Sequence, residues 1–359
     1  MAEALKNSYN RDFLNKLGNR VLFYHLDFPV TSFINSCLNE DWEKLELKAR
    51  MKRISFCLNE FIDGEFKYKA QLLSDVSKHF SSYPACLFPD FIEQFGLNDY
   101  EASIQALEIM TCYSSSEFAV RPFIKKFPDK MMQQMLKWAQ HQNHHVRRLA
   151  SEGCRPLLPW GKVLNHLKND PSPILPILNI LKNDPSEYVR KSVANNLNDI
   201  GKNQPQILKD FARNNLGKIS DNCDKMIKHA CRNFLKQSDP EILKIFNYPK
   251  PSHIQLSEFK WDNKIKLNSQ LGFSFKLNSK KPLGLIRLEY ALEFLRSNGT
   301  YGRKVFKISE SDINDDFKSW SRNHNMVERS VRKYYPGKQF LSLIINGVEF
   351  TKVEFELIP

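Results

Sequence analysis

The sequence predicts a mainly α-helical chain that ends in a small all-β domain, and three observations support this prediction. Apolar residues recur at helical spacing from the start of the chain to about residue 245, and short breaks such as Asp184-Pro185 separate the helical stretches. Within this region a motif repeats at a spacing of about 40 residues. Beyond it, apolar and polar residues alternate, as they do in half-buried strands. We therefore predict a helical domain over residues 1–246, a linker over 247–255 and a β domain over 256–359.

The repeat is visible when three segments are aligned, beginning at His144, Glu187 and Lys225. Each contains a β-branched apolar residue that is followed by a basic residue and, four positions on, by a small or apolar residue. The aligned pairs are Val146 with Ala150, Val189 with Val193, and Ile227 with Cys231. The spacing resembles that of the HEAT repeat, a helical pair that buries its apolar face only by stacking on its neighbours. The helical domain is therefore predicted to be a HEAT-like α-solenoid with an inner concave surface.

The C-terminal domain begins after a segment that cannot remain helical, because Tyr248-Pro249 and Lys250-Pro251 lie within it. Four stretches of alternating residues follow, at 264–279, 283–296, 303–311 and 339–357. Asn346-Gly347 divides the last stretch, as a hairpin turn does. About 100 residues with some seven short strands match an immunoglobulin-like β-sandwich in size and rhythm. The term describes architecture only, because no paired cysteines indicate an antibody-type domain.

The charge balance favours a polyanionic partner. The chain of 359 residues has 53 Lys and Arg against 40 Asp and Glu, a formal net charge of +13, and such a surplus suits binding to nucleic acid. The alternative is a coding bias that scatters lysine over solvated faces. Clustering of the cations on one surface would favour a polyanionic partner over this alternative. We find neither a secretory h-region nor a run of about 18 apolar residues, and expect a cytoplasmic protein that does not enter a membrane.

The seven cysteines are widely spaced and include no Cys-x-x-Cys pair. A disulfide framework or a zinc site is therefore not expected. We expect the protein to work without a bound metal or cofactor.

The helix that begins at His144 has two distinct faces, because each residue advances about 100° around the axis. One face is apolar and is expected to pack into the solenoid; it carries Val146, Leu149, Ala150 and Gly153. The other is polar and is expected to be free for a ligand; it carries Arg148, Ser151, Glu152 and Arg155. In later repeats the same face is predicted to present Lys191, Asn195 and Asp199, and then His229, Asn233 and Lys236.

Arg148 and Glu152 are spaced i, i+4, so their side chains can meet. Alone, such a surface ion pair would contribute roughly 0 to 1 kcal/mol. In a solenoid, however, the polar faces of successive repeats line one groove, where lysine and arginine can neutralise phosphates. DNA phosphates repel carboxylates, so acids in such a groove require a different explanation. Stabilisation of a positive charge that develops during a reaction is one such explanation.

Three segments also carry a family resemblance. The string RRLASEGCRPLLPWG, which contains Glu152 and Trp160, is similar to the hallmark segment of AlkC, a HEAT-like relative of the AlkD family of alkylpurine DNA glycosylases. The stretches LELKARMKRI and SSSEFAVRPFI, the second of which contains Glu117, agree with it. The resemblance spans residues 1 to about 245. The C-terminal sandwich fits as well, because one AlkC subgroup has an Ig-like domain after its repeats.

This resemblance implies a DNA glycosylase that hydrolyses the N-glycosidic bond of cationic alkylated bases, chiefly 3-methyladenine and 3-methylcytosine, without drawing the lesion into a deep pocket. We expect a monomer that acts on double-stranded DNA containing such bases. The alkylated base is already a good leaving group, so the enzyme has to steady the oxocarbenium-like sugar and place a water, which carboxylates can do. The first candidate is Glu152, and Glu117 and Asp199 complete an acidic cluster. Trp160 is placed against the deoxyribose or the cationic base, although it could instead cap the core of its repeat.

Cations of the groove and of the sandwich are candidate DNA contacts. In the helical domain these are Arg148, Arg155, Arg190 and Lys191, with Asn195, His229 and Lys236 on the same lining. Arg190 can equally be structural and bond to Asp184. In the sandwich, Arg332 and Lys333 stand beside Tyr334 and Tyr335, a mixture suited to phosphate and sugar, although solvated loop charge explains it as well. Further loop candidates are Lys280-Lys281 and Arg303-Lys304. We hypothesise that the sandwich closes over the DNA face that the solenoid leaves open.

Two other functions remain open from the residues alone. A non-enzymatic HEAT-type scaffold could grip nucleic acid or a protein through the same groove, and Glu152→Gln would then have no base release to abolish. A metal-dependent nuclease could use Glu117, Glu152 and Asp199 as ligands, and its activity would be lost in EDTA.

Overall fold

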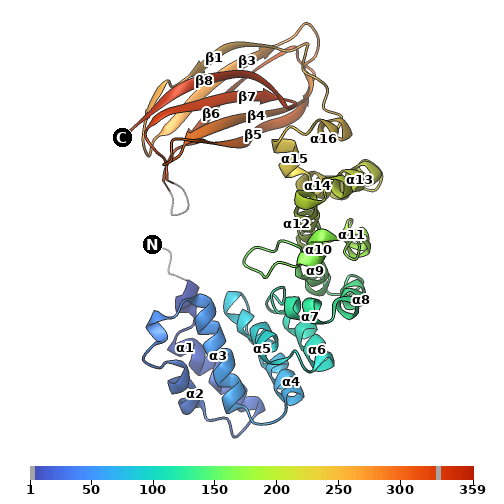
Figure 1. Cartoon of the computed structure of the whole chain (residues 1–359), viewed down its shortest axis with the longest axis vertical. Coiled ribbons are helices and arrows are strands. Elements are labelled where there is room, and N and C mark those ends of the chain that lie inside the picture. Colours follow the sequence, from blue (N-terminus) through green and yellow to red (C-terminus); the bar gives the residue numbers. More distant parts are fainter. Residues whose placement is uncertain (1–4, 329–332) are drawn as a thin grey trace. The chain divides into compact units, whose positions relative to one another are not determined.

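The computed structural model describes residues 5–328 and 333–359, and the chain folds into two compact units. Unit 1 runs to Leu208 and also includes Gly217–Ala230, whereas unit 2 consists of Lys209–Leu216 and Cys231–Pro359. Unit 1 is helical, and unit 2 combines short helices with two sheets (Figure 1). The predicted order of a helical region followed by an all-β region is confirmed.

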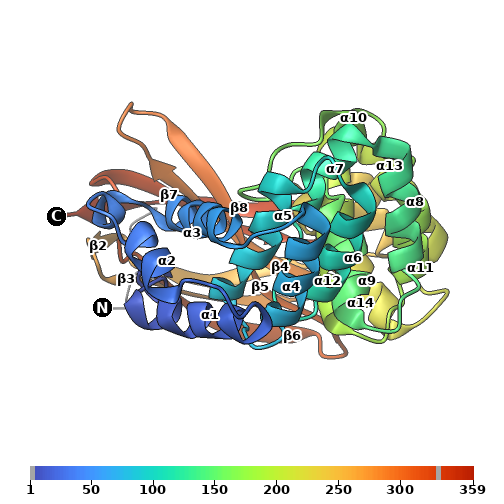
Figure 2. The same cartoon turned by 90° about the horizontal axis from the view of Figure 1, so that it is seen from below.

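Unit 1 is a series of helices that pack against their neighbours along the chain (Figure 2). Its α-helices are α1 (Arg11–Tyr24), α2 (Val30–Cys37), α3 (Leu47–Phe61), α4 (Phe66–Ser77), α5 (Leu87–Phe95), α6 (Tyr100–Met110), α7 (Val120–Lys126), α8 (Pro128–Trp138), α9 (His144–Gly153), α10 (Asn165–Asn169), α11 (Leu175–Leu181), α12 (Glu187–Asn203) and α14 (Asp221–Ala230). Short 3-10 helices η1 (Leu5–Ser8), η2 (Trp42–Lys44) and η3 (Tyr83–Cys86) lie between them, and α13 (Pro205–Asn215) begins in unit 1 and continues in unit 2.

The three aligned segments form α9, α12 and α14, which stack in this order (Figure 1). Val146, Val189 and Ile227 are fully buried, as the alignment requires. The next repeat position, Arg147 in α9 and Arg190 in α12, makes equivalent bonds. In each case Nη1 donates to the carbonyls five and six residues earlier, at 2.7 and 2.9 Å for Arg147 and at 2.9 and 2.6 Å for Arg190. The shared bonds indicate that these helices are copies of one structural repeat.

Unit 2 contains α15 (Arg232–Lys236), α16 (Pro240–Ile245) and two sheets. One sheet has the strand order β1-β3-β6 and the other the order β2-β8-β7-β4-β5. The strands are β1 (Gln255–Trp261), β2 (Lys264–Lys266), β3 (Gln270–Asn278), β4 (Gly284–Leu295), β5 (Tyr301–Ile313), β6 (Phe317–Asn325), β7 (Gly337–Ile345) and β8 (Val348–Ile358). Alternate residues of β3, among them Leu271, Phe273 and Phe275, point into one apolar core with side chains of the second sheet. The described residues thus form eight strands where some seven were expected.

The predicted hairpin turn at Asn346-Gly347 is confirmed. It joins β7 to β8, and both residues have positive φ, 44° and 79°. Both central residues of a type I′ hairpin turn need positive φ, which Asn and Gly adopt more readily than other residues. The Asn346 amide also donates to the Pro249 carbonyl at 2.9 Å, so the turn holds the segment that precedes β1.

Helix α16 and the segment after it are bonded to the strands of unit 2. The hydroxyl of Tyr248 donates to Glu310 on β5, and Gly347 packs so closely against Leu243 of α16 that an added Cβ would clash with it. Lys209 of α13 pairs with Asp239 at 2.8 Å, just before α16. Residues 247–255, which we predicted to be a linker, therefore make specific contacts with the sandwich.

Within residues 5–328 and 333–359, none of the helices has the length and apolar character needed to cross a membrane.

Candidate functional site

The polar face of α9 is buried, not free as predicted. Its side chains pack against α12, and Ser151 and Glu152 are 0% and 5% exposed. Arg155, which was predicted on the same helical face, lies beyond the end of α9 at Gly153 and is 7% exposed. The stacking of repeats that buries the apolar face also covers much of the polar face, since α12 contributes polar partners of its own. The Asn196 amide, for example, donates to the Ser151 carbonyl at 2.8 Å.

Both oxygens of Glu152 are engaged inside this α9/α12 interface. Oε1 accepts from Arg155 Nη1 at 2.5 Å and lies 3.6 Å from Arg148 Nη2, so the predicted i, i+4 pair is present as the longer contact. Oε2 lies 2.6 Å from the hydroxyl of Ser192 on α12. Glu152 is therefore a fixed, charged group held by two guanidinium groups and a hydroxyl.

The network continues to Asp199 on α12. Arg155 Nε donates to Asp199 Oδ2 at 2.9 Å, Nη2 lies 2.9 Å from the same oxygen, and Lys202 Nζ lies 3.0 Å from Oδ1. Burial lowers the pKa of the Arg155 guanidinium, but the charges of Glu152 and Asp199 outweigh burial and raise it above its usual value. Arg155 is thus held between two carboxylates and is buried, so in this structure it is not an exposed phosphate contact.

At the other end, Arg148 joins the network to Glu117. Its Nη1 donates to Glu117 Oε2 and to the hydroxyl of Ser115, which itself donates to the same carboxylate at 2.7 Å. Burial lowers the pKa of Arg148, whereas Glu117 and Glu152 raise it, and the net shift is upward. Among the described residues, no hydrogen bond is made to the second oxygen of Glu117. The side chain of Glu117 is 15% exposed, against 7% for Glu152 and 3% for Asp199.

The structure therefore brings the three predicted acids together as one chain of alternating charges. Its order is Glu117, Arg148, Glu152, Arg155, Asp199 and Lys202. Each pair of neighbouring carboxylates is separated by a guanidinium, which limits their repulsion and fixes their positions. The three carboxylates are balanced by three cations, so the set is neutral as a whole, and its negative charge is fixed at the positions of the carboxylates.

Trp160 is strongly exposed, so it does not cap a core. Its relative exposure is 78%, and its backbone has φ 62°. The Gly161 amide donates to the Leu158 carbonyl at 3.0 Å, which closes a turn with Pro159 and Trp160 at its centre. Proline followed by a residue of positive φ is typical of a type II turn, where glycine or asparagine is preferred at the second position. A large aromatic residue in that place is strained and exposed, which favours a functional reason for its presence.

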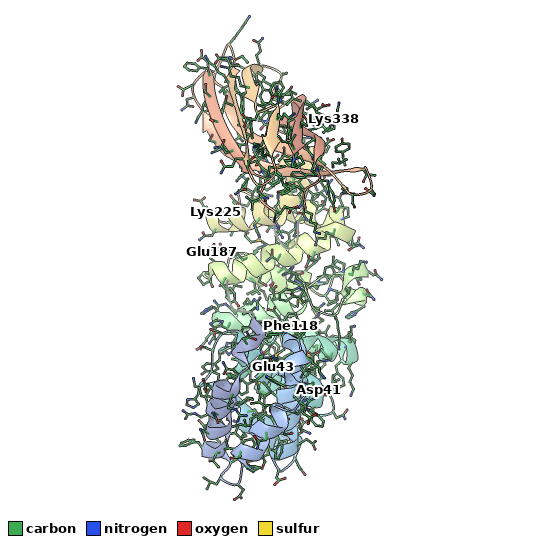
Figure 3. The ribbon with its side chains drawn as sticks, turned by 90° about the vertical axis from the view of Figure 1, so that its left-hand side faces the viewer. Asp41, Glu43, Phe118, Glu187, Lys225 and Lys338 are labelled. Atoms are coloured by element: carbon green, nitrogen blue, oxygen red, sulfur yellow. The ribbon has the colours of Figure 1, made fainter. Side chains whose placement is uncertain are left out.

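A cavity of about 170 Å³ lies beside this turn. Apolar groups, three lysines and two acids line it, and Figure 3 labels one of the apolar side chains, Phe118. Ser115, which bonds to Glu117 and Arg148, reaches the same cavity. Burial raises the pKa of the two acids in its wall, Asp90 and Glu93. The acidic network, the exposed tryptophan and the cavity are thus neighbours in unit 1.

A second hollow, of about 420 Å³, lies between α12 and α14. Three predicted DNA contacts line it, namely Arg190, Lys191 and His229, together with Lys225 and Glu187, both labelled in Figure 3. Lys191 is exposed and pairs with Glu187 at 2.9 Å. Asn195 lies 3.3 Å from His229 across the same two helices. Arg190 and Lys191 are accessible, unlike Arg155.

Two predictions about the groove are corrected in part. Arg190 was expected to bond to Asp184, and it does so through the Asp184 carbonyl, whereas Arg147 reaches the carboxylate, at 2.6 Å. His229, Asn233 and Lys236 were placed on one helical face. The helix ends at Ala230 and a new one starts at Arg232, because Cys231 leaves helical geometry, so His229 belongs to unit 1 and Lys236 to unit 2.

In the sandwich, Lys333 is exposed, whereas Tyr334 is buried in the core and is not a surface contact. Arg332 lies outside the described residues. Arg303 pairs with Glu293 at 2.9 Å and with Glu349 at 2.5 Å, so its charge is already compensated.

Sequence reasoning missed two cations that hold the tryptophan turn. Lys48 Nζ on α3 donates to the Trp160 carbonyl at 3.0 Å. Arg121 on α7, 1% exposed, donates to the carbonyls of Gly153, Arg155 and Lys162 at 3.0, 2.9 and 2.7 Å. Both residues lie within the two shorter segments that carry the family resemblance, but nothing in their spacing indicates which turn they reach.

The geometry describes a helical repeat protein with a buried charge network beside an exposed tryptophan, followed by a sandwich, and comparisons with known proteins give its class. The model of the DNA alkylation repair enzyme family matches residues 93–234, and that of the YhaZ C-terminal Ig-like domain matches residues 255–359. The uncharacterized protein YhaZ of Bacillus subtilis (strain 168) is 43% identical over 355 residues, which cover 98% of this chain and 99% of that protein. The chain therefore belongs to the YhaZ family of DNA alkylation repair proteins.

A solved structure is similar over the full length. It is the alkylpurine DNA glycosylase AlkC of Pseudomonas fluorescens, bound to DNA containing an abasic site analog. It is 29% identical to this chain, with a TM-score of 0.94, and the match covers 99% of this chain and all of that one.

Proposed function

We propose that this protein is a DNA glycosylase that hydrolyses the N-glycosidic bond of cationic alkylated bases in double-stranded DNA, 3-methyladenine and 3-methylcytosine among them. The main support is the full-length similarity to an alkylpurine DNA glycosylase, at a TM-score of 0.94. We further propose that it acts as a monomer in the cytoplasm, without metal or cofactor, through a HEAT-like solenoid. In this account the lesion is bound without entering a deep pocket.

The charge network supplies what the reaction needs. Loss of a cationic base leaves positive charge on the sugar, and fixed negative groups stabilise that charge most where water is excluded. Glu152 and Asp199 are held in place by arginines that balance their charge, and we propose that they supply negative charge locally, at the sugar. Glu117 is the more exposed acid and has an oxygen available, so we assign it the placement of the attacking water and the acceptance of its proton.

Trp160 offers an indole face at the surface, which suits contact with a deoxyribose or with a cationic base. The polar side chains around the α12/α14 hollow, among them Arg190, Lys191 and His229, are proposed to contact phosphates, and Lys236 and Lys333 to do so from unit 2. Binding should then weaken steeply as salt rises, with a log-log slope near −0.9 for each neutralised phosphate.

The test is the release of methylated base from alkylated duplex DNA in EDTA. We expect free base and an equal amount of abasic sites, well above spontaneous loss from DNA without protein, and a rate that falls strongly in Glu117→Gln. Binding without release would favour a scaffold. Strand cleavage that requires divalent cation would favour a nuclease, although acids interleaved with arginines are poorly arranged as metal ligands.

A further inference from the structure

The turn that carries Trp160 is held from outside by one exposed side chain. Lys48 comes from α3, in a distant part of the sequence, and donates from Nζ to the Trp160 carbonyl at 3.0 Å. The same ammonium lies 4.8 Å from the centroid of the Phe118 ring, a cation–π contact. An exposed lysine ordinarily samples many rotamers, and these two contacts together give this one a defined position.

The conformation of the turn is one that tryptophan does not favour. With φ 62°, Trp160 lies in the left-handed region, which residues with a Cβ rarely adopt. The bonds of Arg121 fix the backbone on both sides, at Arg155 and Lys162, but none of them reaches the Trp160 peptide. Within the turn, the bond from the Gly161 amide to the Leu158 carbonyl also favours this conformation. Without Lys48, less would oppose the return of Trp160 to negative φ, and its indole would then point in another direction.

We infer that Lys48 is a positioning residue that keeps the Trp160 indole directed at the lesion. The inference rests on the proposed glycosylase function, because base release is what the indole would support. Lys48 acts through its bond to the Trp160 carbonyl, beyond any attraction that its charge exerts on DNA. The loss of this bond should therefore slow base release more than the loss of one cation explains.

The test compares Lys48→Met with Lys52→Met in single-turnover base release. Lys52 is on the same helix, is exposed and lines the same cavity, but among the described residues it makes no bond to the turn. We expect Lys48→Met to release base about tenfold more slowly than the unaltered protein, which corresponds to the weakest hydrogen bonds that involve a charged group. The rate of Lys52→Met should stay within about threefold of the unaltered rate. Lys48→Arg keeps a cationic donor and should recover most of the rate. Equal rates for the two methionine variants would overturn the inference.

A double variant separates positioning from direct action on DNA. If Lys48 acts through Trp160, adding Lys48→Met to Trp160→Ala should cause no further loss of rate. Independent, multiplying losses would contradict the inference, as would a Trp160→Ala protein as fast as the unaltered one. Iodide quenching, taken as the difference from Trp160→Phe, should also change in Lys48→Met and not in Lys52→Met. Base release by the unaltered protein tests the proposed function by itself, so the two ideas can fail separately.

Discussion

The α9/α12 and α12/α14 interfaces are built from the same repeat but carry different chemistry. Glu152 stands six residues after Val146, and the equivalent position in α12 is Asn195. Arg155 likewise corresponds to Asn198, which donates to the Ala230 carbonyl at 2.7 Å. The first interface thus buries a chain of charges, and the second uses neutral amides in the equivalent places.

This difference indicates that the fold does not require the charges. Burying ionised groups costs free energy that their mutual attraction only partly recovers, so amides or apolar residues are the simpler solution for packing two helices. The α12/α14 interface uses that solution. The charges between α9 and α12, beside the exposed Trp160, are therefore best explained by what they do to a ligand.

The largest effect on stability is expected from Arg155→Met. It would leave the buried carboxylates of Glu152 and Asp199 without their shared partner, and breaking a buried pair in this way costs about 3 to 5 kcal/mol. Lys191→Met, at the position in α12 equivalent to Arg148, removes only an exposed pair with Glu187 and should cost less than about 1 kcal/mol. Urea unfolding of both variants measures the contrast, and similar losses would show that the two interfaces do not differ in this way.

A smaller effect is expected from Ser192→Ala. The hydroxyl lies 2.6 Å from Glu152 Oε2, and its removal leaves a buried charged acceptor short of one partner, which costs about 1 to 3 kcal/mol. Asn195→Ala loses a weak, half-exposed contact and should change the unfolding free energy by less than about 0.5 kcal/mol. Thermal unfolding of the two variants at neutral pH measures the difference. A larger loss of stability in Asn195→Ala than in Ser192→Ala would contradict the prediction.

A third effect depends on pH and concerns Asp90, in the wall of the cavity beside the charged interface. Burial raises the pKa of Asp90, so the folded protein holds this proton to higher pH than the unfolded chain does. Stability therefore falls as pH rises from about 4 through the raised pKa, by at most about 1.4 kcal/mol per pH unit. Asp90→Asn removes this pH dependence. The stability of the variant relative to the unaltered protein should therefore increase as the pH rises from 4 to 7. A difference in unfolding free energy that stays constant with pH would contradict the prediction.

Periodicity predicted the apolar parts of the fold well. Val146, Val189 and Ile227 are buried because helical spacing reports directly on a face that must be covered. The sandwich strands with alternating apolar residues were found for the same reason. Strands β1 and β6 were missed. They are the two edge strands of the three-stranded sheet, and none of the described residues of either strand is fully buried, so no clear alternation marks them.

The site was only partly predictable from the sequence. The spacing of Glu152 and Arg155 placed them on one face, but it could not show that α12 covers that face with Ser192 and Asp199. Contacts between distant segments, such as Lys48 with Trp160, leave no local pattern. The choice of Glu117, Glu152, Asp199 and Trp160 as catalytic residues remains a prediction.

The central claim is that the charges buried between α9 and α12 serve base release, and Glu152→Gln tests it most directly. The matched control is Glu101→Gln, the same chemical change at an exposed acid that pairs with Lys130. In single-turnover assays on alkylated duplex, the account predicts that Glu152→Gln loses about 100-fold or more in rate while still binding DNA, and that the control keeps its rate. A folded Glu152→Gln protein that releases base as fast as the control would contradict the account.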